Sequence, residues 1–207
     1  MREGIFITFE GGDGSGKSTQ IEILRKKLEA AGYDVILTRE PGGTSISEKI
    51  RELILDKDNS EMADMTETML YAAARAQLVN QVIRPALMEG KIVICDRFVD
   101  SSIAYQAYGR GLGECVESIN SFAIGNCMPD MTVLLKVSPE VGSRRISSRD
   151  QDRIESAPTE FHKKVYEGYL SLEKKYPDRI LGIEADNTIE AIAKAIEGAV
   201  TKLLNNR

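Results

Sequence analysis

Cysteine is scarce in this sequence: there are three residues, Cys95, Cys115 and Cys127, and none stands in a C-x-x-C spacing. An odd number without that spacing argues against a disulfide framework and against a metal site. Long apolar runs are also missing near the start, where the longest, residues 5–9, is too short for a signal peptide or a membrane span. The sequence therefore predicts a cytoplasmic protein that does not enter a membrane.

A basic surface is missing as well. The 27 Lys and Arg residues are outnumbered by 32 Asp and Glu residues, so the net charge is -5. A protein that binds a nucleic-acid polymer usually carries a basic face, so no such partner is expected. Any anion that binds must be held by a few local groups.

The remaining composition is that of one globular domain spanning residues 1–207, with 42% apolar and 29% charged residues. Short β-branched or aromatic runs alternate with helical spacing of apolar residues, which predicts an α/β fold with a mainly parallel sheet covered on both faces. Strands are expected at residues 4–10, 34–38, 91–96, 131–137 and 180–184. Helices are expected from 17 to about 31, at 45–55, at 66–89 with a bend or break at Pro85, and at 189–204.

One segment does not look like core. Residues 143–158 contain four arginines and almost no apolar residues. We predict that this segment is a mobile lid.

Residues 11–18 match G-x-x-x-x-G-K-[ST] in full, between an expected strand and an expected helix. Glycines let backbone N–H groups approach phosphate oxygens, and the helix adds its positive N-terminal end. In this pattern Lys17 reaches the β- and γ-phosphates and the Ser18 hydroxyl is a ligand for Mg²⁺. The triphosphate-binding residues expected here are Gly11, Gly12, Asp13, Gly14, Ser15, Gly16, Lys17, Ser18 and Thr19.

A P-loop alone does not separate kinases from GTPases and motor ATPases. The chain has no Asn-Lys-x-Asp, and no Asp-x-x-Gly follows the third strand; Asp96-Arg97 stands there instead. A carboxylate at this sheet edge suits the water shell of a metal ion, and an arginine suits a second phosphate group. A solvated ion pair at the strand end is the alternative. The pattern favours a kinase that uses ATP.

Longer strings resemble the bacterial type of thymidylate kinase, a P-loop nucleoside monophosphate kinase family. They follow the family's order and spacing over nearly the whole chain, and they are Phe9-Glu10 through Thr19, Arg39-Glu40-Pro41-Gly42-Gly43-Thr44, Tyr71-Ala72-Ala73-Ala74-Arg75, Asp96-Arg97-Phe98 through Ser101-Ser102 to Ala104-Tyr105-Gln106, and Asp152-Arg153-Ile154-Glu155. The resemblance implies a five-stranded parallel sheet and the reaction ATP + dTMP → ADP + dTDP with Mg²⁺, on the route to dTTP. It also implies a homodimer.

The resemblance implies a role for each matching residue. Asp13 resembles the aspartate that reaches the deoxyribose 3′-hydroxyl, and Arg97 with Arg51 resembles the pair that holds the dTMP phosphate. Tyr71 matches the aromatic residue that stacks on thymine, and Arg75, four residues later on the same helix, matches the donor to a thymine carbonyl. The residues matching positions near the base and sugar are Ser102, Tyr105 and Gln106, with Tyr105 placed to crowd out a 2′-hydroxyl.

The sequence departs from some members at Gly14, where they carry an arginine in the P-loop. By this resemblance the missing charge comes from the lid, with Arg149 and Arg153 as the catalytic arginines beside Lys17, Asp96 and Arg97. Either Arg144 or Arg145 is expected to lie against adenine, and of the two we favour Arg145 as the ATP-binding residue. An exposed, charge-rich helix end is the alternative for those two.

The single histidine, His162, follows the lid on a polar helix face and is therefore expected at the surface. A general base is not expected, because the attacking phosphate oxygen is largely ionised at pH 7. Two other functions stay open. The chain could be a kinase of another nucleoside monophosphate or small substrate, or an ATP-dependent switch that transfers no phosphoryl group.

Overall fold

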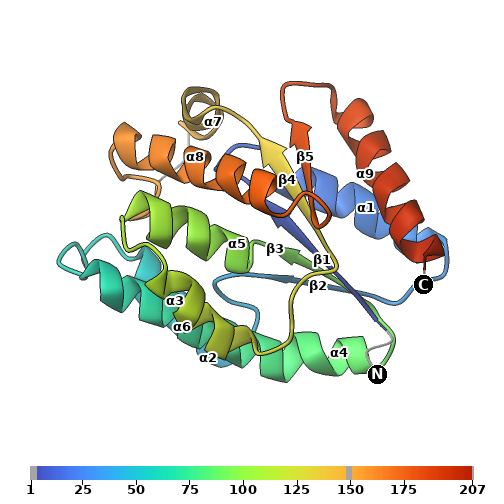
Figure 1. Cartoon of the computed structure of the whole chain (residues 1–207), viewed down its shortest axis with the longest axis horizontal. Helices are drawn as coiled ribbons and strands as arrows, with labels where there is room; N and C mark the ends of the chain where they lie inside the picture. Colours follow the sequence, from blue (N-terminus) through green and yellow to red (C-terminus); the bar gives the residue numbers. More distant parts are fainter. Residues whose placement is uncertain (1–3, 148–150, 207) are drawn as a thin grey trace.

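The structure is a computed structural model and describes residues 4–147 and 151–206. Its five strands form one sheet in which every neighbouring pair is parallel, in the order β2-β3-β1-β4-β5. The α/β prediction with a five-stranded parallel sheet is therefore confirmed (Figure 1). The strands are β1 Ile5–Glu10, β2 Val35–Arg39, β3 Ile92–Asp96, β4 Met131–Lys136 and β5 Ile180–Glu184.

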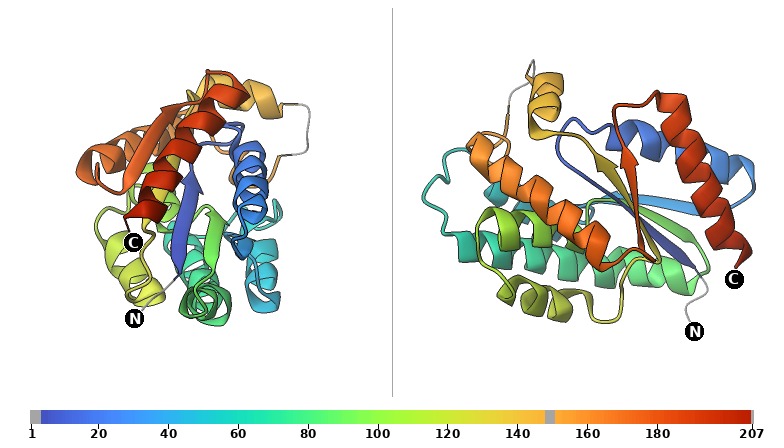
Figure 2. Two further views of the ribbon diagram at one scale, coloured as in Figure 1. Left: turned by 90° about the vertical axis from the view of Figure 1, so that its right-hand side faces the viewer. Right: turned by 45° about the horizontal axis from the view of Figure 1, so that its top comes forward.

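Helices cover both faces of this sheet. The helices α1 Lys17–Ala30 and α9 Ile189–Asn205 pack against each other on one face, which the left view of Figure 2 brings forward. The opposite face carries the other helices of the described residues except α7, with α2 packed on α3 at the outside, while α7 lies at the sheet edge against the P-loop. These helices, α7 included, are α2 Ser45–Leu55, α3 Asp64–Leu78, α4 Arg84–Met88, α5 Val99–Ser102, α6 Cys115–Ile124, α7 Pro139–Ile146, α8 Thr159–Lys175 and two π-helical segments, η1 Val79–Ile83 and η2 Ile103–Gly109.

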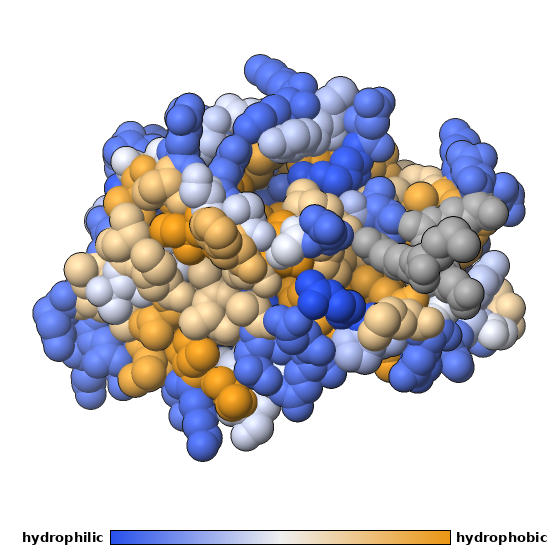
Figure 3. Space-filling model, turned by 60° about the horizontal axis from the view of Figure 1, so that its bottom comes forward, coloured by the Kyte–Doolittle hydropathy of each residue, from blue (hydrophilic) through white to orange (hydrophobic). Residues whose placement is uncertain are grey.

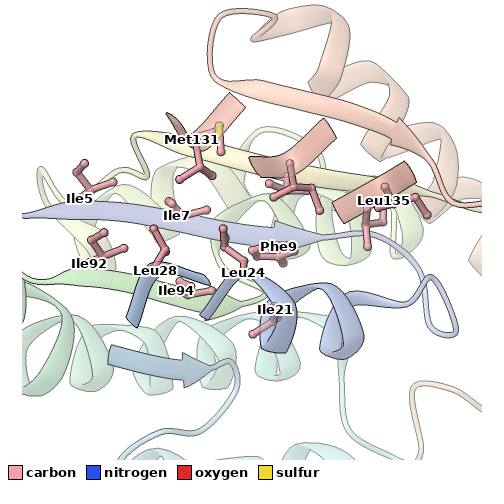
Figure 4. Close-up of a cluster of buried hydrophobic side chains, with 14 of the residues drawn as sticks. Ile5, Ile7, Phe9, Ile21, Leu24, Leu28, Ile92, Ile94, Met131 and Leu135 are labelled. Carbon is pink, nitrogen blue, oxygen red and sulfur yellow. The ribbon is translucent and has the colours of Figure 1, made fainter. Parts of the chain in front are cut away.

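Side-chain alternation along β1 builds the two halves of the core. Ile5, Ile7 and Phe9 pack toward α1 and α9, and Figure 4 shows them facing Leu24 and Leu28 of α1. Phe6 points to the other face. All of β1 is buried, because a central parallel strand is covered on both sides.

The long helix expected at 66–89 is interrupted as Pro85 suggested. The interruption is the π-helical segment η1, which lies just before Pro85 at the start of α4. Proline lacks an N–H group and its ring crowds the preceding turn of a helix. The wider π-helical turn of η1 makes room for that ring.

The predicted lid is partly helical and partly anchored. Its first residues complete α7, and Ile154 near its other end is buried in the cluster around α8. Ile154, together with the partly buried Ala157, therefore ties that half of the segment to the core.

The parallel register explains where polar side chains gather. Phe9 of β1 is paired with Asp96 of β3, so the P-loop after β1 and Arg97 after β3 leave the sheet at the same edge. The end of β2 brings Glu40 and Pro41 to that edge too. Ligand sites of parallel sheets lie at the carboxyl ends of the strands, where the strand order reverses.

Candidate active site

A cavity of about 570 Å³ opens at this edge of the sheet. The P-loop forms one end, and residues from α2, α3, β3 and η2 form the other. Of the residues predicted from the sequence, those that line it are Asp13, Gly14, Ser15, Gly16, Lys17, Ser18, Thr19, Arg51, Tyr71, Arg75, Asp96, Arg97, Ser102, Tyr105, Gln106 and Arg145. The structure thus brings together residues that lie as far apart in sequence as 13 and 145.

Lys17 points into the P-loop. Its Nζ donates to the carbonyl oxygens of Gly11 and Gly12, each at 3.0 Å, and lies 3.5 Å from Ser15 Oγ. Burial, and to a smaller extent the charge of Arg97, lowers the pKa of Lys17 to about 8. A phosphate group at the loop would restore the favourable environment of the ammonium ion.

Gly14 has no room for a side chain. Its φ is +74°, and a Cβ there would lie 2.5 Å from the carbonyl oxygen of Gly142 in α7. A Cβ on Gly142 would in turn lie 2.4 Å from the carbonyl oxygen of Asp13. The P-loop and α7 therefore meet through two glycines, and an arginine at position 14 is excluded by this backbone approach.

Asp96 and Ser18 both line the cavity and are the residues that could hold a magnesium ion. Asp96 Oδ1 is buried and has no hydrogen-bond partner among the described residues. No cluster of three or more His, Cys, Asp or Glu side chains that could hold a metal occurs in residues 4–147 and 151–206. Magnesium needs no such cluster, because it is usually bound by one or two carboxylates together with phosphate oxygens and water.

Arg97 is the one non-glycine residue with a positive φ, +68°, in the part of the chain that the structure describes. Its NH2 group donates to Asp13 Oδ1 at 2.7 Å, and its guanidinium lies 5.2 Å from the centre of the Tyr105 ring. Burial tends to raise the pKa of Asp13, but the charges of Arg97 and Lys17 hold it below its usual value. The Tyr105 hydroxyl is 3.4 Å from the other Asp13 oxygen.

Arg75 is 1% exposed and all five of its N–H donors have acceptors within reach. Nε donates to Glu40 Oε2 at 2.7 Å, and NH2 lies 2.5 Å from the same oxygen and 3.0 Å from Phe98 O. NH1 donates to Ser102 Oγ at 2.8 Å and to Asn120 Oδ1. A base carbonyl must therefore share or replace one of these acceptors.

The rest of this end of the cavity is held by α2 and α3. Arg51 donates to Pro41 O at 2.8 Å, and burial lowers its pKa. Tyr71 is half-buried, and burial followed by the charge of Glu67 raises its pKa above the usual range. Gln106 is 1% exposed and donates to Glu67 Oε1 at 3.0 Å.

The lid arginines differ in what they contact. Arg145 donates to Gly14 O at 3.1 Å and to Ala185 O at 3.2 Å, so it bridges the P-loop and the end of β5. Arg144 donates to Glu140 O of its own helix. Arg149 lies outside the described residues.

Arg153 is turned away from the P-loop. Its NH2 group donates to Glu67 Oε2 at 2.7 Å and its Nε to Ile54 O at 2.8 Å. Arg110 also donates to both carboxylate oxygens of Glu67. Burial tends to raise the pKa of Glu67, but these hydrogen bonds outweigh it and keep the pKa below its usual value.

A second cavity of about 380 Å³ lies beyond Asp13 and Tyr105, between α7, residues 151–157 and α8. His162, expected at the surface, is half-buried and lines this cavity. Its ring packs edge-on against Phe161 with centroids 5.3 Å apart.

Several residues of the site were missed from the sequence. The matching strings contain Glu10, Arg39, Glu40, Asp152 and Glu155, but the resemblance assigns no role to them. All but Glu10 line the large cavity, and Glu10 lies directly behind it. Asn120 was not considered. A polar residue on the buried face of α6 was the one signal that pointed to it.

Comparison with known proteins agrees with this geometry. A family model described as thymidylate kinase matches residues 9–196. A thymidylate kinase of Exiguobacterium is 52% identical, over 91% of this chain and 90% of the relative, and one of Clostridium novyi is 48% identical, over 96% and 98%. The crystal structure of thymidylate kinase from Ehrlichia chaffeensis superposes with a TM-score of 0.79 at 34% identity, covering 96% of this chain and 98% of that one.

Proposed function

We infer that this chain, which belongs to the thymidylate kinase family, phosphorylates dTMP to dTDP at the expense of ATP, on the route to dTTP. One observation carries this best: a single cavity is lined by residues 13–19 of the P-loop at one end and by three arginines, two tyrosines, a serine and a glutamine at the other. A switch that only hydrolyses ATP has no use for the second set. We call residues 13–19 the donor end of the cavity. The acceptor end consists of Arg51, Tyr71, Arg75, Arg97, Ser102, Tyr105 and Gln106.

We propose the following division of work. Lys17 and the P-loop amides hold the ATP phosphates, while Arg97 and Arg51 hold the dTMP phosphate in line with them. Tyr71 stacks on thymine, Arg75 and Ser102 face a base carbonyl, and Asp13 and Tyr105 meet the sugar. The phosphate group of dTMP, with a second pKa of about 6, is largely ionised at neutral pH, so its attacking oxygen needs no general base.

Mg²⁺ is proposed as the cofactor, with Ser18 as a ligand and Asp96 acting on its water shell. Bound there, it would neutralise charge on the β- and γ-phosphates. The unpartnered, buried Asp96 Oδ1 supports this assignment.

The lid, residues 143–158, is proposed to close over ATP and exclude water, which would otherwise compete as acceptor. Arg145 would lie against adenine, and its bridge between Gly14 and Ala185 supports that place. Arg149 and Arg153 would meet the transferred phosphoryl group. For Arg153 this means leaving Glu67 when the lid closes.

A homodimer is proposed through α2, α3 and α6. These helices expose large apolar side chains, among them Phe122 at 89%. Figure 3 shows apolar side chains gathered on the face that carries these helices. Exposed patches of this kind mark protein interfaces. The side chains are Ile46, Leu53, Met65, Met69 and Phe122.

No helix of the described residues is both long and apolar enough to cross a membrane. We propose a cytoplasmic location, where ATP and nucleotide precursors are found.

The test is ATP consumption with dTMP, dUMP, dCMP, dGMP and dAMP offered separately. Rapid turnover with dTMP is the expected result. Faster turnover with another monophosphate would change the substrate, and hydrolysis without any transfer would favour a switch.

A further inference from the structure

Glu10, the last residue of β1, is fully buried and lies directly behind Arg97. Its two carboxylate oxygens accept four hydrogen bonds. Oε1 accepts from the backbone N–H of Phe98 at 2.8 Å and of Ser101 at 3.3 Å. Oε2 accepts from Ser101 Oγ at 2.5 Å and from the Tyr169 hydroxyl at 3.0 Å.

The first pair of bonds holds the backbone of Arg97. An arginine at φ +68° is strained, and such strain persists only when the surroundings enforce it. Here the N–H of Arg97 donates to Phe9 O at 2.9 Å, and the next N–H, that of Phe98, donates to Glu10. Glu10 therefore fixes the peptide that follows the strained residue.

The second pair of bonds sets the direction of two hydroxyl groups. Ser101 and Tyr169 each have one proton to donate. Ser101 gives its proton to Glu10, and Tyr169 gives its own to Glu10 or to Ser101 Oγ, which is 2.9 Å away. In either arrangement both oxygens keep a lone pair for Arg97 NH1, which lies 3.3 Å from each.

Arg97 is thereby oriented without using all of its donors. NH1 is held by the two hydroxyls and NH2 by Asp13, which leaves Nε–H and one hydrogen on NH2. An arginine that presents parallel N–H groups binds a phosphate in a bidentate manner.

We propose that Glu10 is a positioning residue: through Ser101 and Tyr169, and through the Phe98 amide, it sets Arg97 in the orientation that binds the monophosphate. This proposal rests on the proposed function of Arg97. It assigns to Glu10, which is fully buried and does not line the cavity, a specific effect on the binding of dTMP.

Glu10→Gln tests it with little change of shape. The amide oxygen can still accept from the Phe98 N–H, but the NH₂ group must then donate to Ser101 and Tyr169. Their protons would turn toward Arg97, which is itself a donor. We expect the KM for dTMP to rise at least about tenfold, as when a charge-assisted hydrogen bond is lost, with the KM for ATP within about twofold.

Two further variants decide whether the effect passes through the hydroxyls. Ser101→Ala with Tyr169→Phe, which keeps Glu10, should raise the KM for dTMP as Glu10→Gln does. Adding Glu10→Gln to that pair should cause no further loss. Tyr166→Phe, on the same helix α8 but lining only the second cavity, is the matched control and should leave both KM values unchanged.

The proposal is overturned if Glu10→Gln leaves the KM for dTMP at the wild-type value, if it raises both KM values alike, or if the triple variant loses as much again. If Glu10→Gln does not fold, the Ser101/Tyr169 double variant decides alone, since an unchanged KM for dTMP there contradicts the proposal. A wild-type enzyme that does not phosphorylate dTMP would instead overturn the proposed function.

Discussion

The donor and acceptor ends of the cavity are built from different parts of the chain. The donor end is mostly backbone, with a loop of consecutive residues, one lysine and the close contact of Gly14 with Gly142. The acceptor end is made of side chains, and its arginines are held by partners from other segments, as Arg75 is by Glu40 and Asn120. Backbone geometry is fixed by local sequence. An array of buried charges is fixed only by the whole fold, because each charge needs its partner to offset desolvation.

The first prediction, with the largest effect, removes a buried ion pair from the acceptor end. Arg75→Ala leaves Glu40 buried at 4% exposure without its partner, and burial already raises the pKa of that carboxyl to about 7. Removing one member of a buried pair costs about 3–5 kcal/mol. We expect the free energy of unfolding, measured with denaturant, to fall by that amount.

Adding Glu40→Gln to Arg75→Ala should recover part of the loss. Arg25→Ala is the control, because its partners Glu22 and Glu29 lie on an exposed helix face, and its unfolding midpoint should hardly move. Equal losses for Arg75→Ala and Arg25→Ala would contradict a stabilising role of the buried pair. A test of thymine recognition at Arg75 must therefore control for folding.

The second prediction concerns the lid, which joins the two ends. Arginines that meet the transferred phosphoryl group are worth roughly 10³–10⁵ in rate in related reactions. We expect Arg149→Ala and Arg153→Ala each to lower kcat on the order of 10²-fold or more, with smaller changes in both KM values. Steady-state kinetics of both variants, measured beside Arg144→Ala, test which arginines of the lid act on the phosphoryl group. The largest loss of kcat for Arg144→Ala would mean that Arg149 and Arg153 are wrongly assigned.

Glu67→Gln separates two roles for Arg153. If Arg153 leaves Glu67 and acts on the phosphoryl group, the kcat of Arg153→Ala is far below that of Glu67→Gln. If Arg153 only anchors the lid to α3, both variants lose the same amount and the double variant loses no more. The second outcome would count against Arg153 as a catalytic residue.

This contrast also explains what the sequence could and could not predict. The sheet, the P-loop and the meeting of Asp96-Arg97 with it follow from local patterns and from the rule that parallel strands end at one edge. The partners Glu40, Glu67 and Asn120 do not, because no spacing links residue 40 with 75 or 67 with 153. From the sequence, glycine at position 14 was interpreted as the loss of a positive charge. The close approach of Gly142 gives a steric reason for glycine there, and no local pattern contains that reason.

The third prediction perturbs the donor end alone. Gly142→Ala would place a Cβ 2.4 Å from the Asp13 carbonyl oxygen, so α7 and the P-loop must separate. Overpacking of this kind costs about 1–3 kcal/mol. We expect the KM for ATP to rise roughly tenfold, which corresponds to 1.4 kcal/mol, with dTMP affected less.

Gly198→Ala is the matched control. Nothing lies within 4 Å of a Cβ there, on α9, so this variant should stabilise the protein by about 0.4–1 kcal/mol and leave both KM values unchanged. If Gly142→Ala keeps the wild-type KM for ATP, the contact of the two glycines does not shape the donor end.

The fourth prediction, with the smallest effect, uses pH to weaken the acceptor end. Burial, reinforced by Asp100, raises the pKa of Glu10 to about 7, although Arg97 opposes the shift. Lys17 and Tyr169 also face this carboxyl. Below about pH 7 the carboxyl gains a proton and donates it to Ser101 Oγ or to the Tyr169 hydroxyl, and the hydroxyl that accepts it must turn its own proton away from Glu10. The KM for dTMP should therefore rise as the pH falls from 8 to 6, while the KM for ATP changes less.

The same shift has the opposite sign for folding. Because the folded state holds this proton more tightly than the unfolded chain, Glu10 contributes stability that is complete below about pH 4.5 and is lost as the pH rises through about 7. Ionisation of Glu10 thus favours dTMP binding and disfavours the fold. Since dTMP itself titrates near about pH 6, the comparison must be made with Glu10→Gln, whose KM for dTMP should follow the ligand alone. If the wild type and Glu10→Gln show parallel pH profiles for dTMP, then Glu10 does not titrate in this range, and the pH dependence belongs to the ligand rather than to the acceptor end.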